Sequence, residues 1–458
     1  MYKVHTHALC KFIVTQESIM KLTIMGAGST VFSKNIIGDV LCTEALRKCE
    51  IALYDIDPRR LEESFIMANA LNRNLNEGHA KIEKFLGVEN RKAALKGASY
   101  VINTIQVGGY DPCTITDFEV PKKYGLRQTI GDTTGVGGIF RALRTIPVLA
   151  DFARDMEAVC PNAWFLNYTN PMAPLSGYMQ RYTGINTVGL CHSVQVCSRG
   201  LLRALGIEFK EPIKEKIAGI NHMGWLLELY DADGTDLLSE VRKRAISVLE
   251  NPPENQYDLV RYEYIRRLGY YCTESSEHNA EYNNFFIKSK YPELIDRYKI
   301  PLDEYPRRCI NQIERWNEEK DLYTSNEIHH TRSTEYASYI MEAMETDVPF
   351  KIGGNVLNNG LIDNLPKEAC VEVACLVNKS GVQPCVQGPL PVQLAAMNMT
   401  EINVHLLTIE AAVTRKKEHI YQAVMLDPHA SSELSIDDIV KMCDELIDRH
   451  GSWLPQYH

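Results

Sequence analysis

A strand that passes into a helix through two glycines, at residues 21–40, constrains the fold of this chain more than any other segment. Residues 21–25 (KLTIM) alternate and include β-branched side chains, as a short strand requires. Gly26 and Gly28 then permit a tight turn, and helical spacing begins at Ser29. Free backbone N–H groups and the helix dipole at such a helix start attract a pyrophosphate. The segment therefore predicts the first strand and helix of a dinucleotide-binding unit.

An acidic residue follows the next strand, IALYDID (51–57). Asp55 lies after the apolar run, near where the adenosine ribose of a bound dinucleotide would offer its hydroxyls. An acid there suits NAD, because it would repel the extra phosphate of NADP. The G-x-G-x-x-G motif is incomplete, since Val31 occupies its third glycine position. The strand, the turn, the helix and the acid together still favour NAD as a cofactor.

Strands and helices alternate through the rest of the first half. A helical pattern at 58–76 is followed by a short strand at 81–87, a helix near 89–97 and a buried strand at 98–109. This β-α-β-α-β order predicts a doubly wound, Rossmann-type parallel sheet. Such sheets bind ligands at the carboxyl ends of their strands. The candidate cofactor contacts are therefore Gly26, Gly28, Ser29, Thr30, Asp55 and Asn103.

The length of the chain, 458 residues, exceeds one ordinary core and predicts two domains. We expect an NAD-binding Rossmann-like domain over residues 20–195. The pattern then changes to antiparallel strands mixed with helices, which predicts an α+β substrate domain over residues 196–458. Residues 1–19 contain no apolar run long enough for a signal peptide, and Met20 directly precedes the first strand. We interpret residues 1–19 as an N-terminal extension.

Charge and cysteine content argue against several classes of function. The chain carries 49 Lys+Arg against 59 Asp+Glu, a net charge of −10, and no basic block stands out. Nucleic acid and anionic membranes are therefore poor partners. No apolar stretch approaches the ~18–20 residues of a membrane span. The thirteen cysteines have irregular spacing and no C-x-x-C pair, which predicts a reducing cytoplasm and free thiols instead of disulfides.

Two further strands bring polar and reactive side chains to one edge of the sheet. AWFLNYTNP ends in Asn167 and Asn170, whose amides suit sugar hydroxyls, and INTVGLCHS ends in Cys191 and His192. A thiolate from Cys191 and an imidazole from His222 suit a borderline transition metal such as Mn, Fe, Co, Ni or Zn. His192 suits a general acid, because the pKa of a histidine lies near neutrality.

Each of these residues also has a plain structural interpretation. Cys191 is one of thirteen thiols, and both histidines can be hydrogen-bonded structural residues. The two asparagines can be turn formers before Pro171. The polar run TESSEHNAEY (273–282) can be a solvated loop instead of the rim of a site. The residue patterns leave both interpretations open.

Eight segments together resemble glycoside hydrolase family 4, over essentially all of residues 20–458. They are GAGST, YDIDPRRLEES, QVGGYDPCTITDFEV, NYTNPMA, VGLCHSVQ, GINHM, TESSEHNAEY and GLIDNLPKEACVEVACLV. Members of this family are similar in fold to lactate and malate dehydrogenases and use NAD⁺ with a divalent metal, typically Mn²⁺. They are an exception to the two-carboxylate scheme of glycosidases. Within the family, the resemblance is greatest to bacterial α-galactosidases and implies hydrolysis of melibiose-like α-galactosides.

The resemblance also implies roles for the candidate residues. Cys191 and His222 would hold the metal, which chelates the C2 and C3 oxygens of the sugar. Asn170 would bind a sugar hydroxyl, with Asn167 as its neighbour. His192 would be the acid, at a position where some relatives carry an aspartate.

The implied reaction is an oxidation and an elimination followed by their reversal. NAD⁺ takes hydride from C3, and the metal polarises the resulting ketone as a Lewis acid. The C2 hydrogen is thereby acidified and is removed by a base, for which Glu274 and Tyr282 are both candidates. The C1 substituent leaves with help from the acid, water adds at C1, and C2 is reprotonated. NADH then returns the hydride, so the net reaction is hydrolysis.

Several alternatives remain open. Within the family, an α-galacturonidase, α-glucuronidase or α-glucosidase is possible, because the sequence does not fix which sugar hydroxyl is axial. Outside it, an NAD-dependent hydroxy-acid dehydrogenase would release NADH, although a Cys–His metal pair argues against the His–Asp relay of such enzymes. A non-enzymatic NAD sensor would bind NAD without turnover. The family resemblance further implies a homodimer or homotetramer that acts on a small-molecule α-glycoside.

Overall fold

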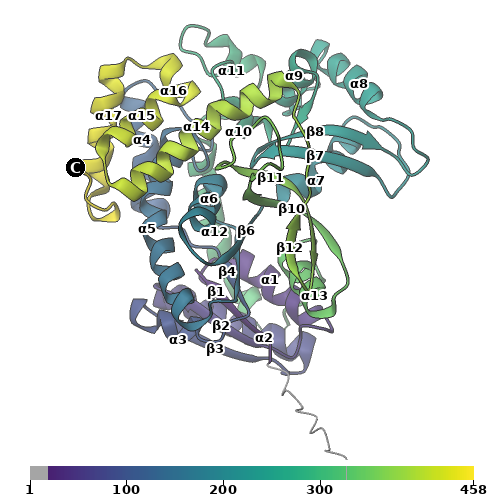
Figure 1. Cartoon of the computed structure of the whole chain (residues 1–458), viewed down its shortest axis with the longest axis vertical. Helices are drawn as coiled ribbons and strands as arrows, with labels where there is room; N and C mark the ends of the chain where they lie inside the picture. Colours follow the sequence, from purple (N-terminus) through teal and green to yellow (C-terminus); the bar gives the residue numbers. More distant parts are fainter. Residues whose placement is uncertain (1–18, 326) are drawn as a thin grey trace, which may run out of the picture.

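The first half of the chain forms the parallel part of a sheet in the computed structural model, which describes residues 19–325 and 327–458 (Figure 1). The strands are β1 (Lys21–Met25), β2 (Glu50–Asp55), β3 (Lys81–Leu86), β4 (Tyr100–Asn103), β5 (Trp164–Asn167) and β6 (Asn186–Leu190). They lie in the order β3-β2-β1-β4-β5-β6, and each neighbouring pair is parallel. This is the strand order of a dinucleotide-binding Rossmann sheet, so the predicted fold class is confirmed.

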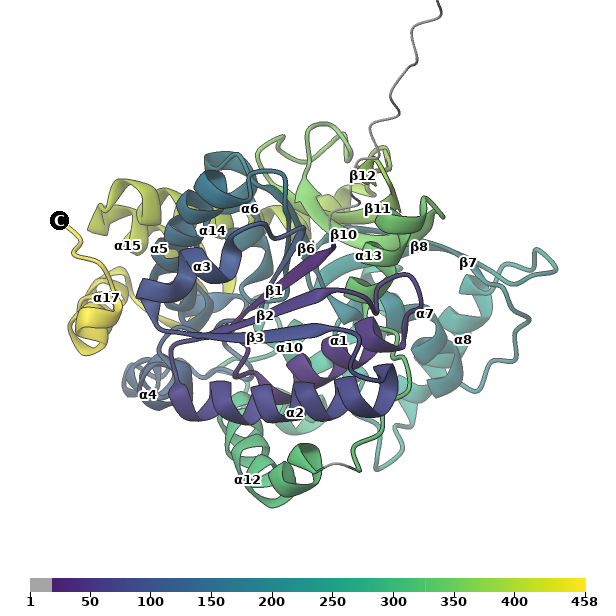
Figure 2. The ribbon, with the colours of Figure 1, turned by 90° about the horizontal axis from the view of Figure 1, so that it is seen from below.

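Helices cover both faces of these strands, as a doubly wound sheet requires (Figure 2). One face carries α1 (Thr30–Cys42) and α2 (Pro58–Asn76), and the other carries α3 (Arg91–Leu95), α5 (Gly135–Val159) and α6 (Met172–Tyr182). α4 (Ile115–Lys123) precedes α5, and α7 (His192–Ala204) leaves β6. Asp57 caps α2 by accepting the Arg59 and Arg60 N–H groups, with Pro58 at the start of the helix.

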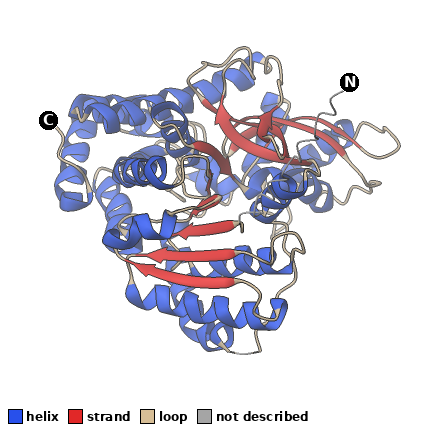
Figure 3. Cartoon of the chain, turned by 60° about the horizontal axis from the view of Figure 1, so that its bottom comes forward, coloured by secondary structure: helices blue, strands red, loops and turns tan. Residues whose placement is uncertain are grey.

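The second half of the chain adds antiparallel strands to the same sheet (Figure 3). They are β7 (Lys214–Ile220), β8 (Met223–Tyr230), β9 (Tyr271–Cys272), β10 (Phe350–Leu357), β11 (Cys370–Asn378) and β12 (Gly381–Pro384). β10 pairs with β6, and the sheet continues through β11, β7, β8 and β9. The predicted mixed α+β second half is confirmed. Because α7 spans the predicted boundary at residue 195 and the sheet crosses it, the division into two domains stays a prediction.

The remaining helices surround the antiparallel strands and the far side of α5. They are α8 (Leu238–Glu250), α9 (Leu259–Leu268), α10 (Ser276–Glu281), α11 (Glu293–Arg297), α12 (Glu304–Thr324), α13 (Tyr336–Thr346), α14 (Val392–Thr414), α15 (Lys417–Leu426), α16 (Pro428–Glu433) and α17 (Ile436–His450). In the part of the chain that the structure describes, no helix is long and apolar enough to cross a membrane. All twelve cysteines of that part are free, as predicted from their spacing.

One row of directly opposed residues crosses the sheet at the carboxyl ends of the parallel strands. The paired registers place in this row Met25, Asn103, Asn167, Gly189, Asn355, Glu372 and Gly219. Side chains in such a row lie on the same face of the sheet. Asn103 accordingly donates to Asn167 at 2.9 Å, and Asn355 donates to Glu372 at 2.9 Å. The parallel and antiparallel parts therefore meet in a buried polar row.

Gly189 in this row provides a test of how closely the two parts pack. A Cβ at Gly189 would lie 2.5 Å from Ser176 Oγ and 2.8 Å from Asn355 Cβ. We expect Gly189→Ala to lower the free energy of unfolding by about 1–3 kcal/mol, because the core must shift to accept the methyl group. The measurement is chemical denaturation of the metal-free protein.

Gly200 is the matched control, because it is an exposed residue inside α7 where an added methyl group would meet open space. Gly200→Ala should raise the free energy of unfolding by about 0.5–1 kcal/mol through helix propensity. Equal stability of the Gly189→Ala variant and the wild type would contradict the close packing of the row.

Candidate active site

The turn after β1 brings an acid against two glycines. Gly26 has a φ of +86°, which favours glycine, and a Cβ there would lie 2.9 Å from the Ile105 backbone nitrogen. A Cβ at Gly28 would lie 2.8 Å from Asp55 Oδ2. Asp55 Oδ2 instead accepts a hydrogen bond from the Gly28 N–H at 2.7 Å. The predicted ribose-binding acid therefore lies directly beside the glycine turn.

The start of α1 provides backbone N–H groups beside this turn. Ser29, the residue before the helix, makes no side-chain capping bond, and Thr30 is the first helical residue. The first N–H groups of a helix lack partners within the helix, so with its dipole they suit a bound anion. Asn103, at the end of β4, is fully buried and bonded to Asn167. A direct contact between Asn103 and a cofactor stays a prediction, and its burial favours a supporting role.

Three residues that the sequence singled out converge at one point. Cys191 Sγ, a ring nitrogen of His222 and a carboxylate oxygen of Glu274 all lie within 4.8 Å of one another. Cys191 follows β6, His222 lies in the turn between β7 and β8, and Glu274 follows β9. His222 and Glu274 have φ values of 63° and 65°, a strained region in which non-glycine residues cluster at functional sites. These thiolate, imidazole and carboxylate donors fit a divalent transition metal.

Tyr282 lies behind the His222 ring. Its hydroxyl is 2.8 Å from His222 Nδ1, and its side chain is buried. Such a bond fixes the tautomer and the orientation of the imidazole, which leaves Nε2 free to bind a metal. Burial raises the pKa of Tyr282 well above the ordinary value. This arrangement favours Tyr282 as a support for His222 and leaves Glu274 better placed as a base.

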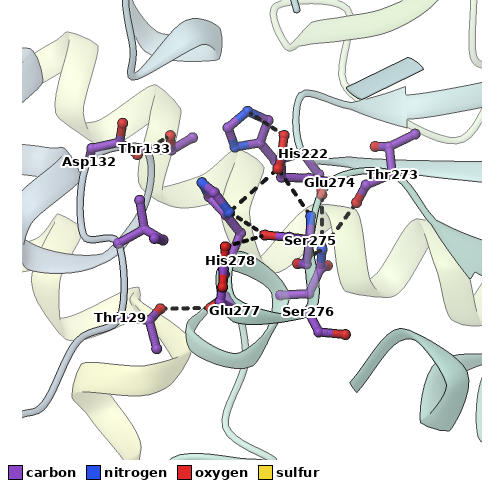
Figure 4. A network of polar contacts seen from close by, with 12 residues as sticks. Thr129, Asp132, Thr133, His222, Thr273, Glu274, Ser275, Ser276, Glu277 and His278 are labelled. Carbon is purple, nitrogen blue, oxygen red and sulfur yellow. Dashed lines mark hydrogen bonds and ion pairs between the residues drawn. The ribbon is translucent and has the colours of Figure 1, made fainter. Parts of the chain in front are cut away.

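Glu274 faces two imidazoles (Figure 4). Its Oε2 lies 3.5 Å from His222 Nε2, and its Oε1 lies 3.5 Å from His278 Nδ1. Burial alone would raise the pKa of Glu274, but the two imidazoles and the Ser275 N–H lower the pKa to about 2. Glu274 is therefore ionised near neutral pH, which suits a group that binds a cation.

The loop that enters α5 faces this cluster from the opposite side, with Asp132 and Thr133 turned toward it (Figure 4). Asp132 Oδ2 lies 3.5 Å from Asn170 Nδ2. Arg141 on α5 donates to the Asn170 carbonyl at 3.2 Å and to the Tyr305 hydroxyl at 3.1 Å. The sequence indicated only that this loop is rich in glycine, so Asp132 and Arg141 were missed. Asn170 is half-buried and lies among polar partners, whereas Asn167 is fully buried beneath it.

His192 begins α7, and its side chain is 46% exposed at the edge of the cluster. Its Nε2 bonds to Glu335 Oε1. This hydrogen bond raises the pKa of His192 above the ordinary value, which favours the protonated imidazole. A protonated imidazole at an accessible edge has the chemistry of a general acid. Glu335 lies 143 residues further along the chain, and no sequence pattern pointed to it.

Glu372 is a buried acid beneath the cluster that the sequence also did not identify. Its Oε1 accepts from Asn355 at 2.9 Å and from Asn221 at 3.3 Å. Asn221 directly precedes His222, so this carboxyl group joins β10 to the turn that carries the imidazole. Glu372 is 1% exposed, and burial raises its pKa to about 7.

The raised pKa of Glu372 predicts a pH dependence of stability. Between pH 4.5 and 7 the unfolded chain loses this proton while the folded chain keeps it, so folding stability falls as the pH rises through this window. A shift of this size corresponds to about 3 kcal/mol at most. Glu372→Gln imitates the protonated acid and should not lose this stability. Denaturation of chelator-treated protein at pH 5 and pH 8 tests this, and a constant difference between the variant and the wild type would contradict it.

The chain is 60% identical over 438 residues to an α-galactosidase of Bacillus subtilis strain 168, covering 95% of this chain and 99% of that protein. It is 31% identical over 450 residues to an α-galactosidase of Rhizobium meliloti, covering 95% and 89%. Among solved structures, a 6-phospho-α-glucosidase from gut microorganisms, described in complex with NAD and Mn²⁺, has 18% identity and a TM-score of 0.76. It covers 96% of this chain and all of that chain, and shows the shared fold alone.

Two family models cover most of the sequence. The model described as family 4 glycosyl hydrolase matches residues 21–207. The model described as the family 4 glycosyl hydrolase C-terminal domain matches residues 217–430. The matched stretches contain the glycine turn, the Cys–His–Glu cluster and the buried polar row. The chain therefore belongs to glycoside hydrolase family 4 and is a glycosidase.

Proposed function

We propose that this glycosidase hydrolyses α-galactosides with NAD and a divalent metal, Mn²⁺, as cofactors, and that it acts in the cytoplasm. The observation that carries the proposal is the Cys191–His222–Glu274 cluster on the sheet that also carries the Rossmann turn. The 60% identity with a protein named α-galactosidase supports the choice of sugar. The free cysteines support a reducing compartment. A homodimer or homotetramer stays a prediction from the family resemblance.

The residues present fit both cofactors. The α1 N-terminus, Gly28 and Asp55 would hold NAD, and Cys191 and His222 would hold the metal. When bound, these cofactors supply a hydride acceptor and a Lewis acid. The protein contributes fixed donors, because His222 is oriented by Tyr282 and the two metal ligands stand on strand ends that share one sheet.

The side chains around the cluster divide the remaining tasks. Asn170 and Asp132 would bind sugar hydroxyls, because amide and carboxylate groups both bind hydroxyl groups well. Glu274 would take the proton from sugar C2, because its carboxylate lies beside the proposed metal ligands, where a metal would hold the sugar. His192 would give a proton from Nδ1 to the departing oxygen, because Nε2 is engaged by Glu335.

The identity with proteins named α-galactosidase favours a neutral sugar. The Arg141 guanidinium near Asn170 is engaged by the Tyr305 hydroxyl and by a backbone carbonyl, so it is not placed as a free partner for a uronide carboxylate. We therefore favour α-galactosidase over α-galacturonidase activity.

The proposed function is tested by omission. We expect the protein, stripped of metal and cofactor, to hydrolyse 4-nitrophenyl α-galactoside only when NAD⁺, Mn²⁺ and a thiol are all restored. No net NADH should accumulate, because the hydride is returned in each turnover. The matching α-glucoside and α-galacturonide serve as comparison substrates, and Gly200→Ala serves as a control variant that keeps full activity.

Other outcomes would contradict the proposal in part or in full. Turnover of the galacturonide or the glucoside but not the galactoside would overturn the proposed sugar and keep the NAD- and metal-dependent reaction. Stoichiometric NADH release would favour a dehydrogenase. Hydrolysis that proceeds equally well without NAD⁺ and metal would overturn the whole proposal.

Tyr282→Phe separates the two candidate bases. If Tyr282 supports His222, its loss should weaken Mn²⁺ binding about 10–100-fold, and saturating Mn²⁺ should restore most of kcat. Free Mn²⁺ measured by electron paramagnetic resonance gives the affinity without any assay of activity. Unchanged Mn²⁺ affinity together with a kcat that stays low at saturating metal would instead make Tyr282 the base.

A further inference from the structure

We propose that Glu335 is a positioning residue of this active site, which holds the His192 imidazole in one orientation with Nδ1 toward the leaving group. The inference rests on the acid role proposed above for His192 and adds a residue that the sequence did not indicate. Glu335 directly precedes α13, at the end of a segment (327–335) that we call the strap. The strap leads from α12 to α13 and passes over α1.

The contact between the two side chains is direct and shielded. Glu335 Oε1 bonds to His192 Nε2, and the Glu335 side chain is only 10% exposed. Its second oxygen, Oε2, is buried and has no hydrogen-bond partner among the described residues. A buried carboxylate with an unsatisfied oxygen costs stability, and such groups are concentrated at functional sites. A role in orienting the His192 imidazole would explain why the protein keeps this destabilising carboxylate.

The strap is pinned to α1 by a buried aspartate. Asp39 is fully buried and accepts bonds from His330 Nε2 at 2.7 Å and from the Ser333 N–H at 2.7 Å. The Ser333 hydroxyl also donates to Asp39 at 2.5 Å and accepts from the Glu335 N–H at 3.1 Å. One acid of the cofactor-binding helix therefore fixes the backbone two residues before Glu335.

Two further elements fix the strap on the other side. The Tyr168 hydroxyl, at the end of β5, accepts a bond from the Ala337 N–H at 3.0 Å. Gln195 on α7 donates to the Thr334 carbonyl at 2.6 Å. The backbone on both sides of Glu335 is thus held by β5 and α7, which frame the site. A side chain on such a backbone has little freedom to leave its partner.

The His192 ring is also bounded by aromatic side chains. Phe32 on α1 meets it edge-on, with ring centroids 6.1 Å apart, and Tyr168 lies at 6.3 Å. These contacts limit the tilt of the ring, but they do not decide which nitrogen faces the site. The Glu335 bond decides this, since it takes Nε2 and leaves Nδ1. A third group that orients an acid or base is a recurring feature of active sites.

The first test observes the His192 ring itself, without substrate. Carbon-13 NMR of protein labelled at histidine Cε1 gives its resonance, assigned with the His192→Gln variant. We expect Glu335→Ala to shift and broaden this resonance and Glu335→Gln, which keeps an acceptor oxygen, to restore much of it. Glu345→Ala is the matched control, because Glu345 is an exposed acid on α13 that bonds to Tyr100 instead. An unchanged His192 resonance in Glu335→Ala overturns the proposal whatever the reaction is.

The second test asks whether the orientation matters for leaving-group departure. We expect Glu335→Ala to lower kcat/KM about 100-fold for alkyl α-galactosides and less than about fivefold for 4-nitrophenyl α-galactoside, whose leaving group needs little help from an acid. On the alkyl substrate, kcat/KM of Glu335→Gln should be at least about tenfold higher than that of Glu335→Ala. The double variant of Glu335→Ala and His192→Gln should lose no more kcat/KM than the more damaged single variant, because both changes act through the His192 imidazole.

These measurements separate the two proposals. Suppose that Glu335→Ala lowers kcat/KM equally for all leaving groups, whereas the loss in His192→Gln depends on the leaving group. This result would overturn the role of Glu335 and keep the acid role of His192. Losses independent of the leaving group in His192→Gln would overturn the acid role, and with it the catalytic part of the inference. In that case the NMR shift alone decides whether Glu335 positions the ring.

Discussion

The active site depends on how the two parts of one sheet are joined. β6 joins β10 at two pairs, Gly354 with Leu190 and Asn355 with Gly189. The row that contains the second pair continues through Glu372 to Gly219. Cys191 lies two residues after Gly189, and His222 lies three residues after Gly219. A slip of one residue in this register would turn each side chain to the other face of the sheet. The separation of thiol and imidazole is thus set by backbone pairing, not by the two residues alone.

The course of the sheet explains how the Cys191–His222–Glu274 cluster comes to lie on the same sheet as the Rossmann turn. Carboxyl ends of parallel strands already meet where a dinucleotide binds. The antiparallel strands continue the same sheet, so the turn between β7 and β8 brings His222 to this edge. Three buried asparagines lie in the row where apolar side chains would be usual. Asn103 bonds to Asn167 across β4 and β5, and Asn355 bonds to Glu372 across β10 and β11. Such a network favours one arrangement of the strand ends.

The fold class and some of the candidate site residues were predictable from local patterns in the sequence. Gly26, Gly28 and Asp55 were identifiable because a glycine turn and a strand-end acid are fixed by neighbours in the chain. Cys191 and His222 were identifiable by their places at a strand end and a turn, and by their resemblance to family motifs. The fold class followed from the alternation of strands and helices, which is itself a local pattern.

Residues that act across long separations were not predictable from one sequence. Glu335 bonds to His192 from a segment that Asp39 holds against α1, and Glu372 reaches Asn221, the neighbour of His222, through strand pairing. Asp132 lies in a loop that the sequence describes merely as glycine-rich. A local sequence pattern does not predict such contacts, because each one depends on where a distant element packs.

The central claim, that Cys191 and His222 hold a metal at the join of the sheet, is tested most directly by anomalous diffraction. Crystals grown with NAD and Mn²⁺ would be measured on both sides of the manganese absorption edge. Our account predicts one strong anomalous peak bonded to Cys191 Sγ and His222 Nε2, beside the Glu274 carboxylate. A manganese peak bound elsewhere, with neither Cys191 nor His222 among its ligands, would contradict it.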